Sequence, residues 1–182
     1  MYEFDPENCM PVKRYQEFIP HSTLQDSVKR FWILEKEYTP DDEIEEVTPD
    51  PCVELIFNFG AAYSESDSSP ARTLPSICLI GVLSKPLKLR AAGLVKIVAV
   101  RFFAWGALSL LKNNVGLNST LKADLDPLWR QVVERVAANV SSGEYEIAVA
   151  EIEDFLIGAR LNALYGPDQV RAAAKLLHGS KG

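Results

Sequence analysis

The feature that most constrains this chain is a change in the spacing of its apolar residues near Ala104. Before that position, apolar residues occur in short runs or alternate with polar ones, as in residues 87–90. After it, they recur every three or four positions. Alternation predicts half-buried strands, whereas a spacing of three or four predicts one face of a helix. The chain therefore divides into a strand-rich part, residues 1–103, and a helical part, residues 104–166.

The strand-rich part contains short segments that are rich in β-branched, aromatic and aliphatic residues and are bounded by proline, glycine or charges. These segments are residues 28–35, 52–59, 77–80, 87–90 and 95–102. We expect residues 1–27 to be irregular, residues 41–46 to form a solvated loop or strand edge, and residues 64–73 to form a polar loop. Short strands joined by turns are typical of antiparallel sandwiches and barrels.

The helical part predicts three to four helices. A first helix follows Ala104, and the pair Asp126-Pro127 predicts the start of a second, because aspartate caps free N–H groups and proline suits the first turn. A third helix is expected within residues 143–165, and Asp168 caps a short last one. The fold class that follows is α+β, with an antiparallel β-barrel or sandwich before the helices.

The two longer helices each carry an apolar stripe. The stripes can pack on the chain's own sheet, and the second helix could cover the first. Any stripe left exposed would suit a dimer interface, which makes a homodimer the expected assembly. The candidate dimerisation residues are Val132, Val136, Ile152 and Phe155.

Composition excludes several classes of function. The formal net charge is −6, so the chain as given is not expected to grip DNA by itself. No apolar run approaches the roughly 20 residues of a membrane span, and the N-terminal residues do not resemble a secretory signal. We therefore expect a cytoplasmic protein with no membrane partner. The three cysteines are widely spaced and predict reduced thiols rather than a disulfide framework.

The residues available for catalysis are few. The only histidines, His21 and His178, lie far apart in the sequence and stand in no metal-binding motif. No nucleophile elbow, P-loop or dinucleotide-binding motif is present. The sequence therefore predicts no catalytic residue, no metal site and no cofactor.

Two charged residues stand inside apolar strand segments, Glu54 and Arg101. A charge in such a place must face solvent or be paired, because unpaired burial costs several kcal/mol. One interpretation is solvent exposure or an internal ion pair that fixes the strand register. The other is a ligand site in which Trp32, Glu54, Asn58 and Arg101 line a cavity and bind a polar effector. Alternation places Glu54 and Asn58 on the same face of their strand.

Several blocks of sequence resemble one group of AraC-type transcription regulators. Residues 49–60, PDPCVELIFNFG, are similar to that group's PDGCVELIFNLG signature, with Pro51 where glycine is usual. Residues 79–87 resemble its L-x-G-P-x-T-x-P segment, and residues 100–107 its VRF-x-P-G-x-A segment, with Ala104 in place of proline. Residues 15–38 look like the group's opening, which has a proline, a short helix and an aromatic strand.

The resemblance implies a β-barrel or cupin-like N-terminal domain that binds a small molecule and often dimerises. In such regulators a separate C-terminal domain with helix-turn-helix units reads the DNA. Residues 167–182 look like a linker and the first helix of that domain, the rest of which is absent from this chain. The partners expected are a small-molecule effector, a second copy of the chain, and DNA only through the absent domain. Two alternatives stay open: a stand-alone small-molecule-binding or enzymatic cupin-like barrel, and an interaction domain with a filled barrel.

Overall fold

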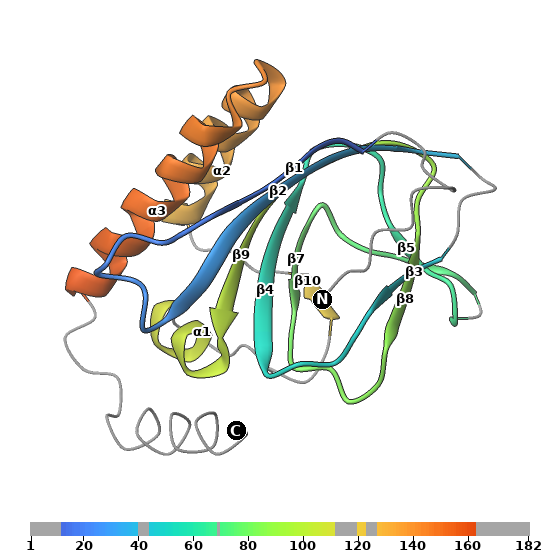
Figure 1. Ribbon diagram of the computed structural model, residues 1–182, viewed down its shortest axis with the longest axis horizontal. Coiled ribbons are helices and arrows are strands. Elements are labelled where there is room, and N and C mark those ends of the chain that lie inside the picture. The colour runs from blue at the N-terminus through green and yellow to red at the C-terminus, as the bar shows by residue number, and fades with distance from the viewer. Residues whose placement is uncertain (1–11, 40–43, 69, 112–119, 123–126, 163–182) are drawn as a thin grey trace.

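The computed structural model of the chain describes residues 12–39, 44–68, 70–111, 120–122 and 127–162. These residues form an α+β fold, as the sequence predicts (Figure 1). The described strands are β1 Val12–Phe18, β2 Val28–Tyr38, β3 Glu45–Val47, β4 Cys52–Asn58, β5 Ser64–Glu65, β6 Arg72–Thr73, β7 Ile77–Ile80, β8 Leu87–Arg90, β9 Gly93–Phe103 and β10 Thr120–Lys122. The described helices are α1 Ala104–Leu110, α2 Pro127–Ser141 and α3 Tyr145–Asn162.

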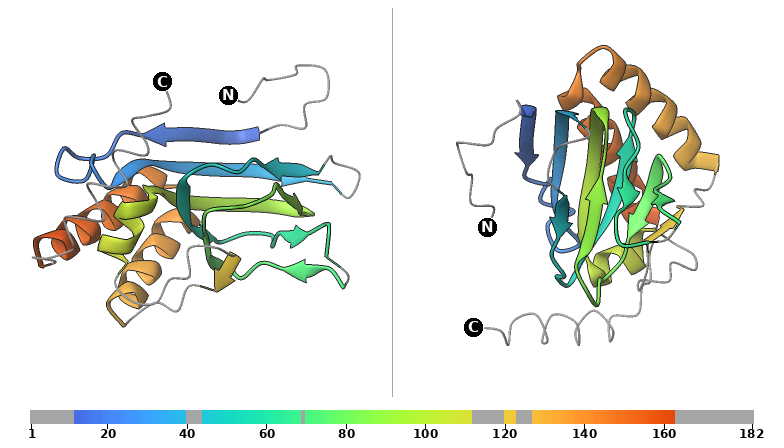
Figure 2. Two further views of the ribbon diagram at one scale, coloured as in Figure 1. Left: turned by 90° about the horizontal axis from the view of Figure 1, so that it is seen from below. Right: turned by 90° about the vertical axis from the view of Figure 1, so that its right-hand side faces the viewer.

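The strands form two antiparallel sheets. The larger sheet has six strands in the order β1-β2-β9-β4-β7-β10, and the smaller has four in the order β3-β8-β5-β6. The small sheet lies on one side of the large one, and α2 and α3 lie on the other side (Figures 1 and 2). Within the described residues the ladders do not close into a barrel, so the α+β class is confirmed and the cupin-like barrel is not.

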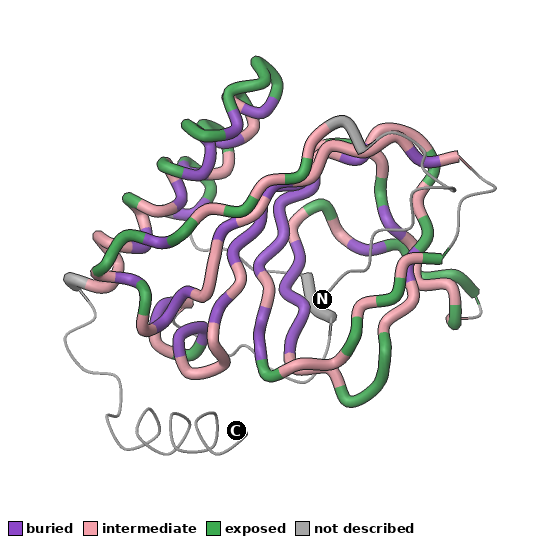
Figure 3. The backbone as a smooth tube through the Cα atoms, in the orientation of Figure 1, coloured by how far each residue is buried: buried purple, intermediate pink, exposed green. Residues whose placement is uncertain are grey.

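The large sheet is apolar on both faces at its centre (Figure 3). On β4 and β9, alternate residues belong to two different hydrophobic clusters, as expected when successive side chains point to opposite faces. One cluster faces the helices and includes Val53, Leu55, Phe57, Val98, Val100 and Phe102. The other faces the small sheet and includes Ile56, Cys78, Ile97, Ala99 and, from the small sheet, Leu89.

Trp129 anchors the helices to the sheet. Its ring centroid lies 5.9 Å from that of Phe57 on β4 and 4.4 Å from that of Phe155 on α3. Gly143, in the turn between α2 and α3, has a φ of 77°, a left-handed conformation in which glycine ends a helix without steric strain. The turn allows α2 and α3 to lie antiparallel and cover one face of the sheet.

This packing decides where the candidate dimerisation residues lie. Val132, Val136 and Ile152 are buried in the helix-facing core, and Phe155 is partly buried against it. The helical stripes therefore pack on the chain's own sheet, which is the first of the two roles considered for them. A homodimer stays a prediction, and it would need a surface other than these three buried side chains.

Several elements differ from the expectation. Residues 12–18, expected to be irregular, form the edge strand β1, in which residues 14–18 alternate between partly buried and exposed. The expected loop at residues 64–73 contains the two-residue strands β5 and β6, and β10 follows the start of the helical part. Strands this short or this polar have little hydrophobic pattern in their sequence. Pairing with neighbouring strands therefore determines whether they form. The fourth helix and residues 167–182 lie outside the described residues.

No helix among the described residues is long and apolar enough to cross a membrane.

Candidate functional site

Arg101 and Glu54 face each other across two central strands of the large sheet. They are register partners in the β4–β9 ladder and lie on the face that looks toward the small sheet. Directly opposed residues in an antiparallel pair have Cβ atoms about 5 Å apart, so long side chains of opposite charge meet readily there. The Arg101 Nη1 group donates a hydrogen bond to Glu54 Oε1 at 2.7 Å.

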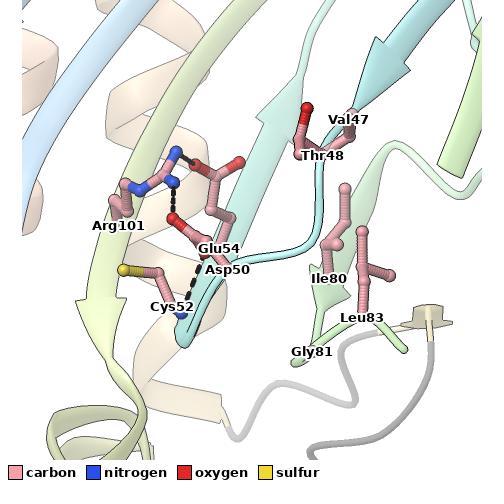
Figure 4. Close-up of a pocket in the computed structure, with 9 residues that line it drawn as sticks. All are labelled: Val47, Thr48, Asp50, Cys52, Glu54, Ile80, Gly81, Leu83 and Arg101. Atoms are coloured by element: carbon pink, nitrogen blue, oxygen red, sulfur yellow. Dashed lines mark hydrogen bonds and ion pairs between the residues drawn. The ribbon is translucent and has the colours of Figure 1, made fainter. Parts of the chain in front are cut away.

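A second carboxylate, that of Asp50, holds the same guanidinium. Arg101 Nη2 donates to Asp50 Oδ2, and the other Asp50 oxygen, Oδ1, accepts the backbone N–H of Cys52 at 2.9 Å. Asp50 lies in the loop between β3 and β4, where a short side chain can turn back to bond its own backbone two residues on. Figure 4 shows the arginine bridged between a strand carboxylate and a loop carboxylate.

The two carboxylates have opposite electrostatic environments. Burial raises the pKa of Glu54 above its usual range, although the charge of Arg101 acts against this. Burial also acts to raise the pKa of Asp50, but the Cys52 N–H bond and the Arg101 charge outweigh it and hold that pKa below its usual range. Their exposure agrees with this difference, since 13% of the Glu54 side chain is exposed and 32% of that of Asp50.

Trp32 reaches the same cluster from a strand that is not adjacent to β4. Its side chain lies close enough to Glu54 to favour the ionised carboxylate and so acts to lower the pKa of Glu54. Between them lies Ala99 on β9, the register partner of both Trp32 and Ile56. Because Ala99 carries only a methyl group, it leaves room for the indole to cross β9.

A small cavity opens beside the cluster. Its volume for water-sized occupants is about 20 Å³, enough for about one water molecule and far below the 300–1,000 Å³ of ordinary ligand pockets. One wall is polar and the other apolar (Figure 4). The lining residues are Val47, Thr48, Asp50, Cys52, Glu54, Ile80, Gly81, Leu83 and Arg101.

Asn58 does not line this cavity. It lies on the same face of β4, four residues from Glu54, or about 13 Å along a strand. Its Nδ2 donates to the carbonyl of Ala61 at 2.7 Å, and its Oδ1 accepts the N–H of Gly60 at 3.0 Å. The amide therefore closes the turn that follows β4.

The structure thus brings together three of the four predicted ligand-binding residues, Trp32, Glu54 and Arg101. It adds Asp50, which the sequence marks only as part of a proline-flanked turn. An aspartate in a turn that leads into a strand with an embedded glutamate is the signal that could have pointed to it. Nothing in the local sequence pairs Asp50 with Arg101, which lies 51 positions away.

The thiols beside the site are protonated at neutral pH. Burial raises the pKa of Cys52, and the Asp50 charge adds to this. Burial also raises the pKa of Cys78, to about 11. The Lys29 ammonium lies 3.8 Å from the Cys52 sulfur. Within the described part of the chain, no group of three or more histidine, cysteine or acidic residues is placed to hold a metal ion.

A second depression lies at the edge of the large sheet. It has a volume of about 180 Å³ and is lined by Glu17, Phe18, Ile19, Lys29 and Arg30. An ion pair joins two of these residues, Glu17 and Arg30. Charged groups therefore gather at this end of the sheet, around both hollows.

Comparison with known proteins identifies one family. A family described as a domain of unknown function (DUF6597) matches residues 16–119, which are 104 of the 182 residues. No curated protein and no solved structure matches the chain. The matched span contains every residue that lines the cavity.

Proposed function

Because the chain belongs to the DUF6597 family, whose description names no activity, we propose a function from the site itself. The chain is the ligand-sensing and dimerisation regulatory domain of an AraC-type transcription factor. Its DNA-binding domain is not part of this chain. The two sheets that face each other across the cavity correspond, in this proposal, to an open form of a cupin-like barrel.

One observation carries the proposal: two of the sequence blocks that resemble AraC-type regulators converge on one polar cluster. Residues 49–60 supply Asp50 and Glu54, and residues 100–107 supply Arg101. Buried ion pairs contribute little net stability, because desolvation offsets most of their attraction. A charged cluster beside a cavity is therefore better explained by recognition of a polar ligand than by folding.

The fold also offers a route from the site to the end of the described chain. Trp32 lies on β2, and the residues just before β2 are clamped to the last turns of α3. Arg160 Nη2 donates to Asp26 Oδ2 at 2.9 Å, and its Nη1 contacts Ser27 Oγ at 3.2 Å. The Trp105 indole N–H of α1 donates to the Asp26 carbonyl at 2.7 Å.

A ligand that favours one placement of β2 would therefore shift the placement of α3. Such a shift needs only that the ligand bind the two arrangements with different affinity. The segment after α3 would carry the change toward the DNA-binding domain.

The sensing role is tested by a binding screen on the intact chain. The probes are panels of small carboxylates, amines, sugars and neutral aromatics, and the readout is the shift in unfolding temperature followed by titration calorimetry. A compound that binds the native chain should lose at least about tenfold in affinity on Arg101→Ala, because its polar group loses a charged partner. Circular dichroism checks that the variant folds.

Arg135→Ala is the matched control, since Arg135 also pairs with a carboxylate, Glu151, but on the far side of the helices. It should leave binding unchanged. Turnover of any probe would favour the stand-alone enzyme instead, and binding that survives Arg101→Ala would place the ligand elsewhere. A chain that binds nothing would favour the interaction domain.

The regulator assignment itself is tested by the intact mass of the native product. A product longer than 182 residues with a basic extension supports it, and one that ends at Gly182 contradicts it. Dimerisation is tested by sedimentation velocity of the chain. Val136→Ala should lower stability without changing the sedimenting mass, because Val136 is buried within its own core.

A further inference from the structure

We propose that the site takes a small-molecule carboxylate, and that the side chain of Asp50 occupies the place of that carboxylate until the ligand displaces it. The inference rests on the proposed sensing function and names the ligand class and the mode of entry. It starts from the hydrogen bonds of the Arg101 guanidinium.

The guanidinium is only partly used by its protein partners. Nη1 bonds to Glu54 and Nη2 to Asp50, while the buried Nε has no hydrogen-bond partner among the described residues. The thiol of Cys52, a weak acceptor, is a further polar neighbour of the guanidinium. Nε and Nη2 form one edge of the guanidinium, the edge that binds a planar carboxylate through two parallel hydrogen bonds.

Asp50 does not fill that edge. Its Oδ1 accepts the backbone N–H of Cys52, and only its Oδ2 bonds to the guanidinium, at Nη2. A carboxylate that is not tethered to this loop can offer both oxygens to Nε and Nη2. Such a ligand therefore makes one more charge-assisted bond to Arg101 than Asp50 does.

Asp50 is also the partner that can leave. It lies in a loop between two prolines, and its side chain is 32% exposed, whereas Glu54 is held in the central strand β4 at 13%. The cavity beside it has room for about one water molecule, so a ligand must displace something to enter. Outward movement of Asp50 frees Nη2 and enlarges the cavity in one step.

Charge favours a carboxylate over an amine. Arg101 faces two carboxylates, and the ammonium of Lys29 acts on Asp50 as well, so the group as a whole carries no excess negative charge. Exchange of one carboxylate for another keeps that balance, and an incoming ammonium would upset it. The opposite wall, with Val47, Ile80 and Leu83, suits a short apolar body attached to the carboxylate.

The experiment measures binding of n-alkyl monocarboxylates, from acetate to hexanoate, and of the matched primary amides to the intact chain by titration calorimetry. We expect the acids to bind and the amides not to, since only a carboxylate pairs with the guanidinium. Asp50→Asn should tighten acid binding by about tenfold if the Asp50 contact is closed in about 90% of molecules, because it removes the internal competitor.

The variants are chosen so that each keeps the fold. Asparagine at position 50 can still accept the Cys52 N–H, and Asp50→Ser provides a second variant with the same local acceptor. Arg101→Gln should abolish acid binding. Arg135→Gln, at an arginine that pairs with Glu151 on the helices away from the site, should leave it unchanged.

The outcomes separate this inference from the proposed function. Equal binding of acids and amides, or unchanged or weakened acid binding in both Asp50 variants, overturns it. If amines or sugars bind in an Arg101-dependent way and acids do not, the ligand class is wrong while the sensing role stands. If no probe of any class binds, both fall.

Discussion

The two faces of strand β4 differ in what they contact and therefore in what they can do. On the helix-facing side its residues pack against α2 and α3 with aromatic contacts and no charge. On the side that faces the small sheet, Ile56 is preceded along the strand by Glu54, which pairs with Arg101. One strand thus contributes to a closed apolar core and to a polar cavity at the same time.

In the proposed function, the two faces separate stability from recognition. Dense apolar packing contributes most of the free energy of folding, whereas buried ion pairs contribute little net. The helices pack on one face, and the smaller sheet lies over part of the other (Figure 2). The polar cluster lies on the side that faces the smaller sheet, next to the small cavity.

The largest effect is expected for Trp129→Ala on the helix-facing side. Trp129 is only 4% exposed and touches both Phe57 and Phe155, so its removal should cost about 3–5 kcal/mol in the free energy of unfolding. Urea denaturation measures the loss. Trp32→Ala, on the opposite face, should cost less because Trp32 is only partly buried. Equal losses of unfolding free energy in the two variants would mean that both faces of the sheet contribute equally to stability.

The neighbours Leu55 and Ile56 test the same difference with side chains of equal size. Leu55 is 1% exposed toward the helices and Ile56 is 9% exposed toward the small sheet. We expect Leu55→Ala to cost about 4 kcal/mol and Ile56→Ala about 2 kcal/mol, because a gap near solvent relaxes more readily. The midpoints of denaturant unfolding, analysed with one shared slope, give the stability loss of each variant. A larger loss for Ile56→Ala than for Leu55→Ala would contradict the difference between the two faces.

The charged cluster should prove dispensable for folding when it is removed as a whole. Arg101→Met alone should cost about 2 kcal/mol, since it leaves Glu54 buried without its cation. The double variant Glu54→Leu/Arg101→Met should lie within about 1 kcal/mol of the native chain, because two apolar groups replace the pair. A double variant as unstable as the single one would assign the pair to folding.

The smallest effect concerns pH. The folded pKa of Asp50 is lowered, so its contribution to stability is present above the unfolded pKa and is lost as the pH falls through the folded one. Asp50→Asn should reduce the acid-induced loss of folding free energy by less than about 1 kcal/mol, because the Asp50–Arg101 pair is partly exposed.

Glu54 has the opposite sign. Its folded pKa is raised, so its contribution is present below the unfolded pKa and is lost as the pH rises through the folded value. Thermal unfolding between acid and neutral pH distinguishes the two carboxylates. If stability depends on pH in the same way in Asp50→Asn and Glu54→Gln, the two carboxylates do not have opposite pKa shifts.

Much of the fold could be predicted from local pattern. The strands β2, β4, β7, β8 and β9 and the start of α2 lie where apolar spacing and turn residues place them. Strand β1 could not be predicted, because an edge strand with charged and polar side chains lacks a buried face of its own. Its pairing with β2 decides it.

The sequence by itself determined which side chains share a face, because alternation in a strand follows from the covalent geometry of the backbone. That was enough to place Glu54 and Arg101 as charges that need partners. Only the tertiary structure decided that Asp50 is the second partner, that Asn58 closes a turn, and that Val132, Val136 and Ile152 are buried. These outcomes depend on which distant segments pack together, and that choice minimises the free energy of the whole chain rather than that of any local segment.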